Sequence, residues 1–496
     1  MPLPTIPSGN VASATASTSF QIANSIMLAG DSYFSRTCSN AYYDEVTFNF
    51  WVKRAVLGTD QGLFGRKGTN ATAHGTFCHF TTDDALLINF RDSGGTSQYY
   101  IITNRLFRDC SAWYNIHIRV DGLDGTQNDR IQLWVNGVRE TSFALFSAPS
   151  STGYQIATFL TNGSQDFTVG RSLRSQVDTF YNLEGYIAEF HCCTGQHYAC
   201  TEFGEFDSDS PNIWKPKETS GLSYGNDGFY LDWEDSADLD DDESGEGHDF
   251  TGTNIAATDQ SIDTPTLNYP ILNTTVQNFG SNNDRFLEGG LKYYCVNTNW
   301  ECAFSSFGFT KGKFYWEVKV ITLASSNGYA NLGVQDYDTL GSSGNANANF
   351  IANSTSAGME LDCRGGANNN IISAGSSVQQ TGVDWAADDI IGFAADMDNK
   401  KLYIHKGGTY LTVGGSVGDP TSGSTGTGAI TIPAGFITCT PAVGIYGANA
   451  IFHFNFGSAN YTISSGNSDA NSQGNFEHSV PSGYFSLNSS NLAEYG

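Results

Sequence analysis

Short runs of alternating apolar and polar residues follow one another along most of this chain, and they limit the folds that it can adopt. Clear examples are VTFNFWVKR (46–54), QYYIITNRLF (98–107) and RIQLWVNGVRE (130–140). Alternation with a period of two places successive side chains on opposite faces of a strand. The Asn136–Gly137 pair inside the third run is typical of a two-residue hairpin turn. The pattern therefore predicts packed antiparallel sheets.

The composition agrees with this fold class. Aromatic residues make up 13% of the 496 residues, Gly occurs 55 times, and only 15% of residues are charged. Chains of this kind, with many short strands and turns, are typical of β-sandwiches and barrels. The chain is also too long for one compact domain. We therefore predict an all-β protein with two β-sandwich domains that are joined by an acidic connector.

An acidic stretch near the middle of the chain interrupts the strand pattern. Between Glu202 and Asp263 there are eighteen Asp and Glu residues against two Lys and no Arg. GFYLDW (228–233) is the only clear apolar element there. This change of composition predicts four regions: an N-terminal arm (1–29), a sandwich domain (30–206), an acidic connector with one strand (207–272) and a second sandwich domain (273–496).

Strand patterns resume after the acidic stretch. GKFYWEVKVI (312–321) alternates strongly, and Asp398–Asn399 separates two further apolar runs as a hairpin turn would. Residues 340–382 and 414–431 are rich in Gly, Ser, Asn and Thr. We expect these two stretches to be long exposed loops, where a β scaffold usually carries its specificity.

The charge of the chain excludes some partners. The net charge of −27 would repel phosphate backbones and anionic lipid surfaces, so nucleic acid and membranes are poor partners. No run of about 18 apolar residues is present, which predicts no membrane insertion. The N-terminus lacks the basic start and apolar core of a signal peptide. The ten scattered cysteines predict reduced thiols in a protein that folds in a cytoplasm.

Two known domain families resemble parts of this sequence. The first block resembles a laminin-G-like, concanavalin A-type jelly roll, and the last block is similar to a SPRY domain. The first resemblance rests on FNFWVKR, FRDCSAWYNIHIRVDG, DRIQLWVNGVRETSF, TVGRS and GYIAEF. The second rests on KGKFYWEVKV, NLGVQD, DIIGFAADMDNKKLYIHKGG, TPAVGIYGANAIFHFNFG and VPSGYFSLNSSNL.

The segment between these blocks resembles one that is common in structural proteins of tailed phages, many of them marine. The resemblances together cover residues 30 to 496 and imply a virion protein, made in the host cytoplasm, of the tail or fibre type. Such a protein binds host-surface glycan or neighbouring virion proteins through its loops, without catalysis, and forms a homo-oligomer in the particle. Two alternatives stay open: a capsid decoration or cement protein, and a glycan-degrading depolymerase.

The acidic stretch DLDDDESGEGHDF (238–250) is a candidate calcium loop. Ca²⁺ takes six to eight oxygen ligands, and closely spaced carboxylates can supply them. The twelfth position from Asp240 is Thr251 rather than Glu, which argues against an EF-hand. A solvated turn without metal, which leads into a strand at HDFTGTN (248–254), is the alternative. The candidate ligands are Asp238, Asp240, Asp242, Glu246 and Asp249.

HCCTGQHYAC (191–200) gathers three Cys and two His within ten residues, so it is a candidate zinc site. The ligands would be Cys192, Cys193, His197 and Cys200. Adjacent residues of a strand point to opposite faces, which argues against shared ligation by Cys192 and Cys193. We therefore favour ordinary buried cysteines.

No catalytic motif is complete. Jelly-roll glucanases carry closely spaced carboxylates in an E-x-D-x-x-E arrangement. Glu360 and Asp362 begin such a motif, but position 365 is Gly. Neither a G-x-S-x-G, an H-E-x-x-H nor a P-loop is present. We therefore predict no catalytic residues.

Aromatic residues provide the candidate ligand-binding side chains. Four Trp residues alternate with apolar neighbours and are predicted to lie in the core: Trp51, Trp113, Trp134 and Trp316. Trp300 and Trp385 lie in polar surroundings, and an exposed aromatic face can stack on a sugar ring. Three Tyr residues lie near the ends of the SPRY-like loops. The candidate ligand-binding residues are Trp300, Tyr329, Tyr337, Trp385 and Tyr446.

Overall fold

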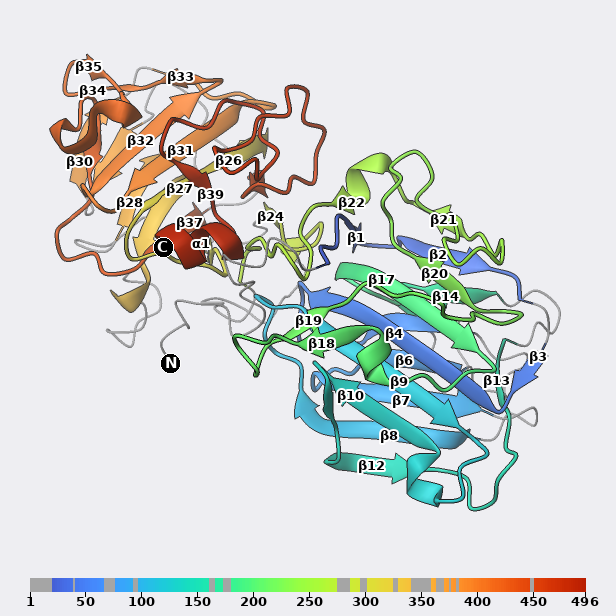
Figure 1. The fold of residues 1–496 in the computed structure, drawn as a ribbon. Coiled ribbons are helices and arrows are strands. Elements are labelled where there is room, and N and C mark those ends of the chain that lie inside the picture. The colour runs from blue at the N-terminus through green and yellow to red at the C-terminus, as the bar shows by residue number, and fades with distance from the viewer. Residues whose placement is uncertain are drawn as a thin grey trace. The chain divides into compact units, whose positions relative to one another are not determined.

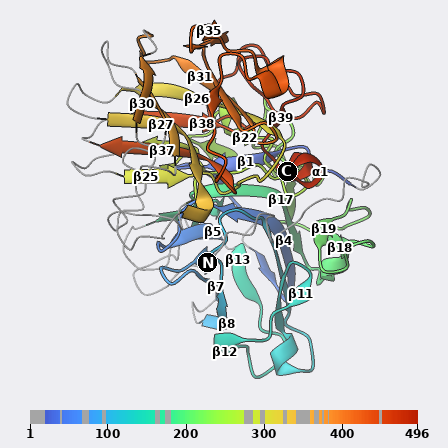
Figure 2. The same ribbon diagram turned by 90° about the vertical axis from the view of Figure 1, so that its left-hand side faces the viewer.

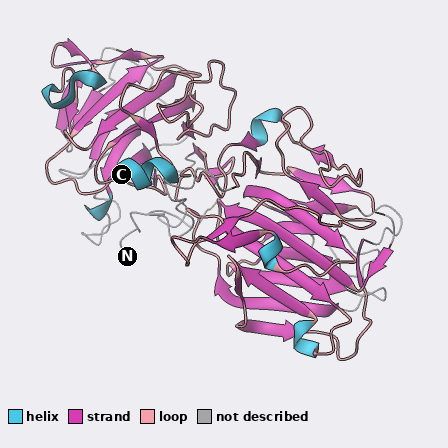
Figure 3. Ribbon diagram, in the orientation of Figure 1, coloured by secondary structure: helices cyan, strands magenta, loops and turns pink. Residues whose placement is uncertain are grey.

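The chain divides into two compact units, the first ending at Thr266 and the second beginning at Leu267. Strands dominate both units (Figure 3), and helical structure among the described residues is limited to short turns and the terminal helix α1 (Ser489–Tyr495). The computed structural model describes residues 20–38, 41–66, 76–91, 97–159, 166–172, 180–273, 286–294, 301–323, 329–339, 358–362, 370–373, 376–380, 383–446 and 450–496. The all-β prediction is confirmed.

The first unit contains two antiparallel sheets (Figure 1). The first sheet consists, in order, of β11 (Val138–Arg139), β10 (Ile131–Val135), β9 (Tyr114–Asp121), β4 (Glu45–Arg54), β17 (Gly185–Thr194), β1 (Ser25–Leu28) and β22 (Gln260–Ser261), with β20 (Phe229–Leu231) also paired to β17. The second sheet consists of β12 (Phe143–Ser147), β8 (Ser97–Leu106), β7 (Ala85–Arg91), β6 (Thr76–Phe80), β5 (Gln61–Arg66), β14 (Phe167–Val169), β2 (Tyr33–Arg36) and β21 (Thr251–Thr253).

Short elements complete the first unit. The paired strands are β3 (Ala41–Tyr43) with β13 (Ile156–Phe159), β15 (Arg171–Ser172) with β16 (Tyr181–Asn182), and β18 (Gly204–Phe206) with β19 (Trp214–Pro216). The helical turns are η1 (Gln127–Asp129), η2 (Cys200–Glu202) and η3 (Ala257–Asp259).

The core of the first unit lies between its two sheets. Alternation places Val46, Phe48 and Phe50 of β4 on the inner face, where all three are fully buried. The ring of Phe48 stacks on that of Phe64 from the second sheet, with 4.5 Å between ring centroids. Burial of a side chain of this size contributes about 2 kcal/mol. Apolar alternation in the sequence is therefore the main cause of the sandwich.

The hairpin predicted at Asn136–Gly137 is confirmed. Trp134 pairs with Arg139 and Val135 with Val138, which leaves a two-residue turn. Both turn residues have positive φ, 48° for Asn136 and 72° for Gly137. This geometry joins β10 to β11 at the edge of the first sheet.

The acidic segment folds as part of the first unit. Its strands β20, β21 and β22 pair with β17, β2 and β1 respectively. The sequence predicts one strand in residues 207–272, with a further strand at HDFTGTN (248–254) if the acidic loop is a solvated turn, whereas the structure has four, counting β19. β19 and β22 were not predicted because they are two or three residues long. β21 (TGT) and β22 (QS) also lack apolar side chains, so backbone pairing alone defines them.

The same segment covers the outer face of the first sheet. Cys193 of β17 packs in a small cluster with Phe203 and Tyr224. The Nε1 of Trp214 donates a hydrogen bond to Oδ1 of Asn115 on β9 (3.1 Å). The β18–β19 hairpin, which carries Trp214, lies beside the first sheet in both views (Figure 1 and Figure 2). Polar side chains on the outer face of the first sheet, such as that of Asn115, are therefore also buried.

The second unit is another two-sheet structure. One sheet consists, in order, of β23 (Phe286–Leu287), β24 (Lys292–Tyr294), β38 (Ile451–Asn455), β26 (Lys313–Thr322), β31 (Ile390–Asp396), β32 (Lys401–Lys406) and β33 (Thr409–Tyr410), with β36 (Ile430–Thr431) on β32 and β39 (Phe485–Ser486) on β26. The other consists of β25 (Glu301–Phe304), β37 (Cys439–Tyr446), β27 (Tyr329–Asp336), β28 (Gly358–Asp362), β29 (Asn370–Ser373) and β30 (Ser376–Gln380). The remaining elements are β34 (Thr412–Val413) paired with β35 (Ser416–Val417), and the turns η5 (Tyr337–Thr339) and η6 (Pro420–Thr425).

The prediction of a long loop over residues 340–382 is wrong in part. Strands β28, β29 and β30 lie inside this stretch and extend the sheet from β27. Their sequences are rich in polar residues, so the alternation that identifies a strand is weak there.

In the described part of the chain, no helix has the length and apolar character that a membrane span requires.

Candidate functional site

A pocket of about 220 Å³ lies at one edge of the first unit. It is formed where the edge strand β11 of the first sheet and the edge strand β12 of the second sheet come together. β10 and the turn η1 complete its wall. The lining residues are Asn128, Ile131, Gln132, Arg139, Glu140, Thr141, Phe143 and Phe146. We call this the edge pocket.

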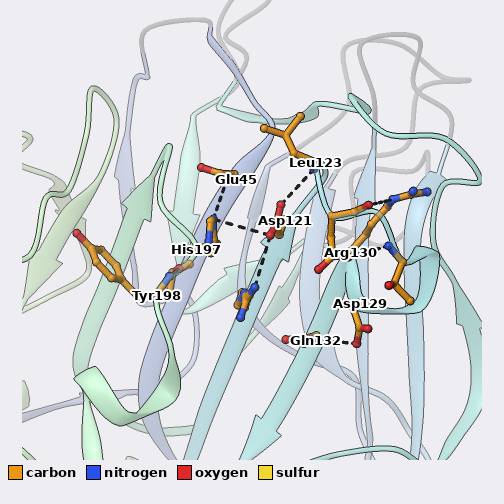
Figure 4. A network of polar contacts seen from close by, with 12 residues as sticks. Glu45, Asp121, Leu123, Asp129, Arg130, Gln132, His197 and Tyr198 are labelled. Atoms are coloured by element: carbon orange, nitrogen blue, oxygen red, sulfur yellow. Dashed lines mark hydrogen bonds and ion pairs between the residues drawn. The ribbon is translucent and has the colours of Figure 1, made fainter.

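A hydrogen-bond network fixes the polar side of the edge pocket (Figure 4). Asp129 of η1 accepts hydrogen bonds at Oδ1 from Gln132 Nε2 (2.9 Å) and from Arg139 Nη2. These hydrogen bonds lower the pKa of Asp129, with that from Arg139 the largest cause. The amide and the guanidinium are therefore held in place before any ligand arrives.

Glu140 is the carboxylate that lines the edge pocket. Its Oε2 accepts a hydrogen bond from Arg105 Nε (2.7 Å), and its Oε1 accepts from the backbone amides of Thr141 and Ser142. Burial opposes ionisation of Glu140, but these hydrogen bonds outweigh it and lower the pKa. Glu140 is therefore ionised at neutral pH.

The apolar side of the edge pocket consists of two half-buried rings. Phe143 and Phe146 pack on the core of the first unit, with 5.2 Å between their ring centroids and 34° between their planes. Leu145, between them in sequence, is 37% exposed, and β12 is an edge strand of its sheet among the described residues. The pocket thus combines aromatic surface with fixed polar groups.

This combination suits the binding of a sugar. Sugar rings place C–H groups against aromatic faces and offer hydroxyl groups to amides, guanidinium groups and carboxylates. Cleavage of a glycosidic bond needs one carboxyl group that is protonated at the working pH. Glu140, the carboxylate among the lining residues, has a lowered pKa. It is suited to accept hydrogen bonds from hydroxyl groups rather than to donate a proton.

A second polar cluster lies beside the edge pocket, where β4 begins and β9 ends. His197, Glu45 and Asp121 bring three potential ligand atoms within 4.8 Å of one another. Figure 4 shows this cluster together with Asp129 and Gln132 on the neighbouring elements. The zinc hypothesis grouped His197 with cysteines, whereas the structure groups it with carboxylates that are distant in sequence.

The cysteines of that hypothesis lie elsewhere. Cys192, Cys193 and Cys200 are free and buried. Burial raises the pKa of the Cys192 thiol well above its usual value and does the same for Cys193. Their burial agrees with our prediction of ordinary buried cysteines.

The candidate calcium residues form one loop with Asp242 at its centre. Oδ1 of Asp242 accepts from the amides of Tyr230 (2.8 Å) and Ser244 (3.0 Å), and Oδ2 accepts from Ser244 Oγ and the amide of His248. Asp240 accepts from Gly252 N. These bonds organise the turn without a metal.

The other candidate ligands of this loop are exposed. Asp238 has a raised pKa because of its hydrogen bond with Asp240, while Glu246 and Asp249 face solvent. Within residues 238–249, no three carboxylates converge as closely as His197, Glu45 and Asp121 do. Calcium binding by the loop stays a prediction.

The aromatic candidates of the second unit are dispersed. Tyr329 and Tyr446 pair directly across β27 and β37. Tyr337 follows the opposite end of β27 and is half-buried, and burial raises its pKa. Trp385 is only 4% exposed, so its ring is not available to a sugar. Trp300 and the side chains of Tyr329 and Tyr446 lie outside the described residues.

One buried polar group in the second unit resembles a catalytic relay. Tyr315 O–H donates to Glu317 Oε1 (2.8 Å), and Tyr315 Oη is 2.8 Å from His405 Nε2. Glu317 also accepts from the amides of Glu477 and His478. Tyr315, Glu317 and His405 are each at most 1% exposed, so no substrate reaches them. The group connects β26 to β32 and to the C-terminal segment.

The edge pocket was not predicted from the sequence. The hairpin that forms one side of it was predicted, but no single motif indicates that the other lining residues are neighbours: Gln132, Glu140, Phe143 and Phe146. Their common signal is RETSFALFS (139–147), a run whose apolar residues follow a turn and are only half-buried. Such a run is typical of an edge strand, where a binding surface can form.

Comparison with known proteins supports the fold of the first unit. Residues 28–192, a third of the chain, match a family model of laminin G type within the Concanavalin A-like lectin/glucanases superfamily. This match confirms the prediction of a laminin-G-like domain there. A search of curated proteins finds no match to the sequence.

Solved structures include several that are similar to parts of this chain. They include the SPRY domain of human HERC1 (15% identity, TM-score 0.26, 34% of this chain and 89% of that chain). A heptameric SAP-like pentraxin from Limulus polyphemus is 13% identical (TM-score 0.28, 43% and 94%). A putative carbohydrate binding protein from Bacteroides ovatus is 13% identical (TM-score 0.29, 47% and 58%). Similarities of this size do not assign a function.

Proposed function

We propose that this chain is a non-enzymatic binding protein of a virus particle, of the tail or fibre type, and that its first unit binds a glycan of the host surface. The observation that carries the glycan part is the edge pocket, where two aromatic rings face fixed amide, guanidinium and carboxylate groups. The match of residues 28–192 to a superfamily that includes lectins supports it.

The size of the edge pocket limits the ligand. At about 220 Å³ it is smaller than the roughly 300–1,000 Å³ of pockets for drug-sized molecules. One sugar unit fits, with a C–H face against Phe143 and Phe146 and its hydroxyl groups toward Gln132, Arg139 and Thr141. A single shallow site of this kind binds weakly, and many copies on one particle would supply avidity.

The virion assignment rests on the order of the sequence resemblances: a laminin-G-like block, an acidic segment like those of phage structural proteins, and a SPRY-like block. The second unit would then contact neighbouring virion proteins or further copies of this chain. We also propose that Ca²⁺ binds the loop of residues 238–249. The ion would stabilise the acidic segment, because neighbouring carboxylates otherwise repel one another.

A depolymerase is the second candidate, because the matched superfamily also includes glucanases and the edge pocket contains Glu140. An enzyme would release shortened products from a host polysaccharide, and Glu140→Gln would abolish that release. The lowered pKa of Glu140 favours binding instead. A glycan that stays intact after prolonged incubation with the chain supports the binding function.

A glycan array probed with the full chain tests the proposal. We expect binding to a limited set of glycans, and loss of this binding in Phe143→Ala and in Arg139→Ala. Leu123→Ala is the matched control, because Leu123 is 55% exposed and does not line the pocket. Binding that survives both pocket substitutions, or no binding to any glycan, would refute the proposal. One copy per capsid-lattice position, without glycan binding, would indicate a decoration protein.

A further inference from the structure

The cluster of Glu45, Asp121 and His197 has the geometry of a metal site. His197 Nδ1 is 2.7 Å from Glu45 Oε1 and 3.9 Å from Asp121 Oδ2. Glu45 is the first residue of β4, Asp121 is the last residue of β9, and His197 lies in the turn after β17. All three side chains point toward one another in Figure 4. Three separate segments therefore meet at one point.

The backbone fixes the two carboxylates. Glu45 and Asp121 are direct cross-strand partners in the β4–β9 ladder, so their side chains share one face of the sheet. The amide of Asp121 donates to the carbonyl of Arg130 (3.0 Å), and the amide of Gly195 donates to the carbonyl of Glu45 (2.8 Å). The positions of these ligands are thus set by the sheet rather than by a flexible loop.

The turn that carries His197 is fixed on both sides. Thr47 Oγ1 accepts from the amide of Tyr198 (2.9 Å) and donates to the carbonyl of Gln196 (3.0 Å). The carbonyl of Tyr198 also accepts from Nε2 of the buried His117 (3.2 Å). The imidazole is therefore held over the two carboxylates before any ion binds, which reduces the entropic cost of binding.

The electrostatics of the cluster favour a cation. Two carboxylates directly opposite each other on a sheet repel one another. Arg119 offsets part of this repulsion, since its Nη2 is 3.5 Å from Asp121 Oδ2. The side chain of His197 is 44% exposed, so an ion can enter from solvent.

We propose that Glu45, Asp121 and His197 bind one divalent transition-metal ion of the zinc class. Imidazole suits zinc and its neighbours, and one His with two carboxylates gives three protein ligands, which leaves a coordination position for water. Three such ligands are too few for Ca²⁺, which takes six to eight oxygens. On binding, His197 Nδ1 loses its proton to solvent and donates its lone pair to the ion, while Nε2 keeps its proton.

The metal site does not depend on the proposed glycan binding. The cluster lies beside the edge pocket and shares no residue with its lining. It also differs from the candidate calcium loop and from the buried cysteines. A test with the metal alone therefore separates the two proposals.

Titration of the metal-free full chain with zinc chloride, followed by calorimetry, tests the site. We expect binding of one ion that is weakened about tenfold or more in His197→Gln and in Asp121→Asn. His248→Gln is the matched control, because His248 lies in the acidic loop of the same unit, and it should bind as the unchanged chain does. Cobalt in place of zinc should give visible absorption bands that disappear in His197→Gln.

Three results would overturn the site. No zinc binding by the unchanged chain would mean that the cluster is only an ion pair. Equal binding by His197→Gln and the unchanged chain would place the ion elsewhere. Loss of binding in His248→Gln would point to the acidic loop. Circular dichroism and thermal unfolding without metal identify a variant that fails to fold, and Glu45→Gln then serves as the second test.

Discussion

Gly137 shows how closely the acidic segment fits the first sheet. Its φ is 72°, and a Cβ atom there would lie 2.1 Å from Cε3 of the buried Trp214. We expect Gly137→Ala to lower the free energy of unfolding by about 2–4 kcal/mol, from backbone strain and displacement of Trp214. Chemical denaturation measures this change.

Gly125→Ala is the matched control for this substitution. A Cβ at Gly125 would meet no atom within 4 Å. The free energy of unfolding should therefore change by no more than about 0.5 kcal/mol. Equal effects of the two substitutions would contradict the described contact between the hairpin turn and Trp214.

A buried ion pair anchors the end of the acidic segment. Lys53 Nζ is 2.6 Å from Asp263 Oδ2, and both side chains are at most 2% exposed. Trp113 Nε1 also donates to Asp263 (3.1 Å). Lys53→Met should cost about 3–5 kcal/mol of the free energy of unfolding, because it leaves a buried carboxylate without its counter-charge.

A double-mutant cycle measures this pair. Asp263→Asn in the Lys53→Met background should restore part of the lost stability, because the remaining polar group is then neutral. The free energy of unfolding of each variant in the cycle is measured by urea denaturation. A cost below about 1 kcal/mol for Lys53→Met alone would mean that the pair is not buried as described.

At the scale of elements, the acidic segment belongs to the first unit. Its residues Phe229, Leu231, Trp233, Leu239 and Phe250 are buried in the core of that unit. We expect a chain of residues 20–266 to unfold cooperatively and a chain of residues 20–206 to lack cooperative unfolding. Thermal unfolding compares the two, and equal stability would show that the segment is dispensable.

Acid should destabilise the first unit through His117 of β9. Burial lowers the pKa of His117 to about 3, from about 6.5 in an unfolded chain. The folded state therefore resists protonation, and its stability is full above pH 6.5 and is lost as the pH falls toward 3. The loss would reach about 3 kcal/mol at pH 4.

His117→Gln tests this effect, because the Gln amide can still donate to the carbonyl of Tyr198. The free energy of unfolding of this variant is measured by denaturation between pH 7 and 4. It should fall less steeply with decreasing pH than that of the unchanged chain, because unfolding of the variant takes up one proton fewer. An unchanged slope would show that another group causes the acid sensitivity.

Sequence periodicity predicted the strands that carry apolar alternation, such as β4, β9 and β26, because burial of one face defines them. It did not predict β22 and β28 to β30, because backbone pairing forms these strands and leaves little side-chain pattern. The same limit applies to sites. The cluster of Glu45, Asp121 and His197 forms because the register of β4 and β9 places residues that are distant in sequence side by side. No local sequence motif indicates this register.

At the scale of the whole molecule, the chain combines two sheet-based units and a large negative charge of −27. The first unit offers the edge pocket, with aromatic and polar groups at the free edges of its sheets. We propose that this pocket holds a glycan without cleaving it. Edge strands are suited to this role because their outer side is not occupied by another strand among the described residues.

Native mass spectrometry of the full chain, after prolonged incubation with the glycan that binds best on an array, tests this claim most directly. We expect a complex with the mass of the chain plus the intact glycan, and its loss in Phe143→Ala. A shortened glycan would instead identify an enzyme. A complex that persists in Phe143→Ala would show that the glycan binds elsewhere.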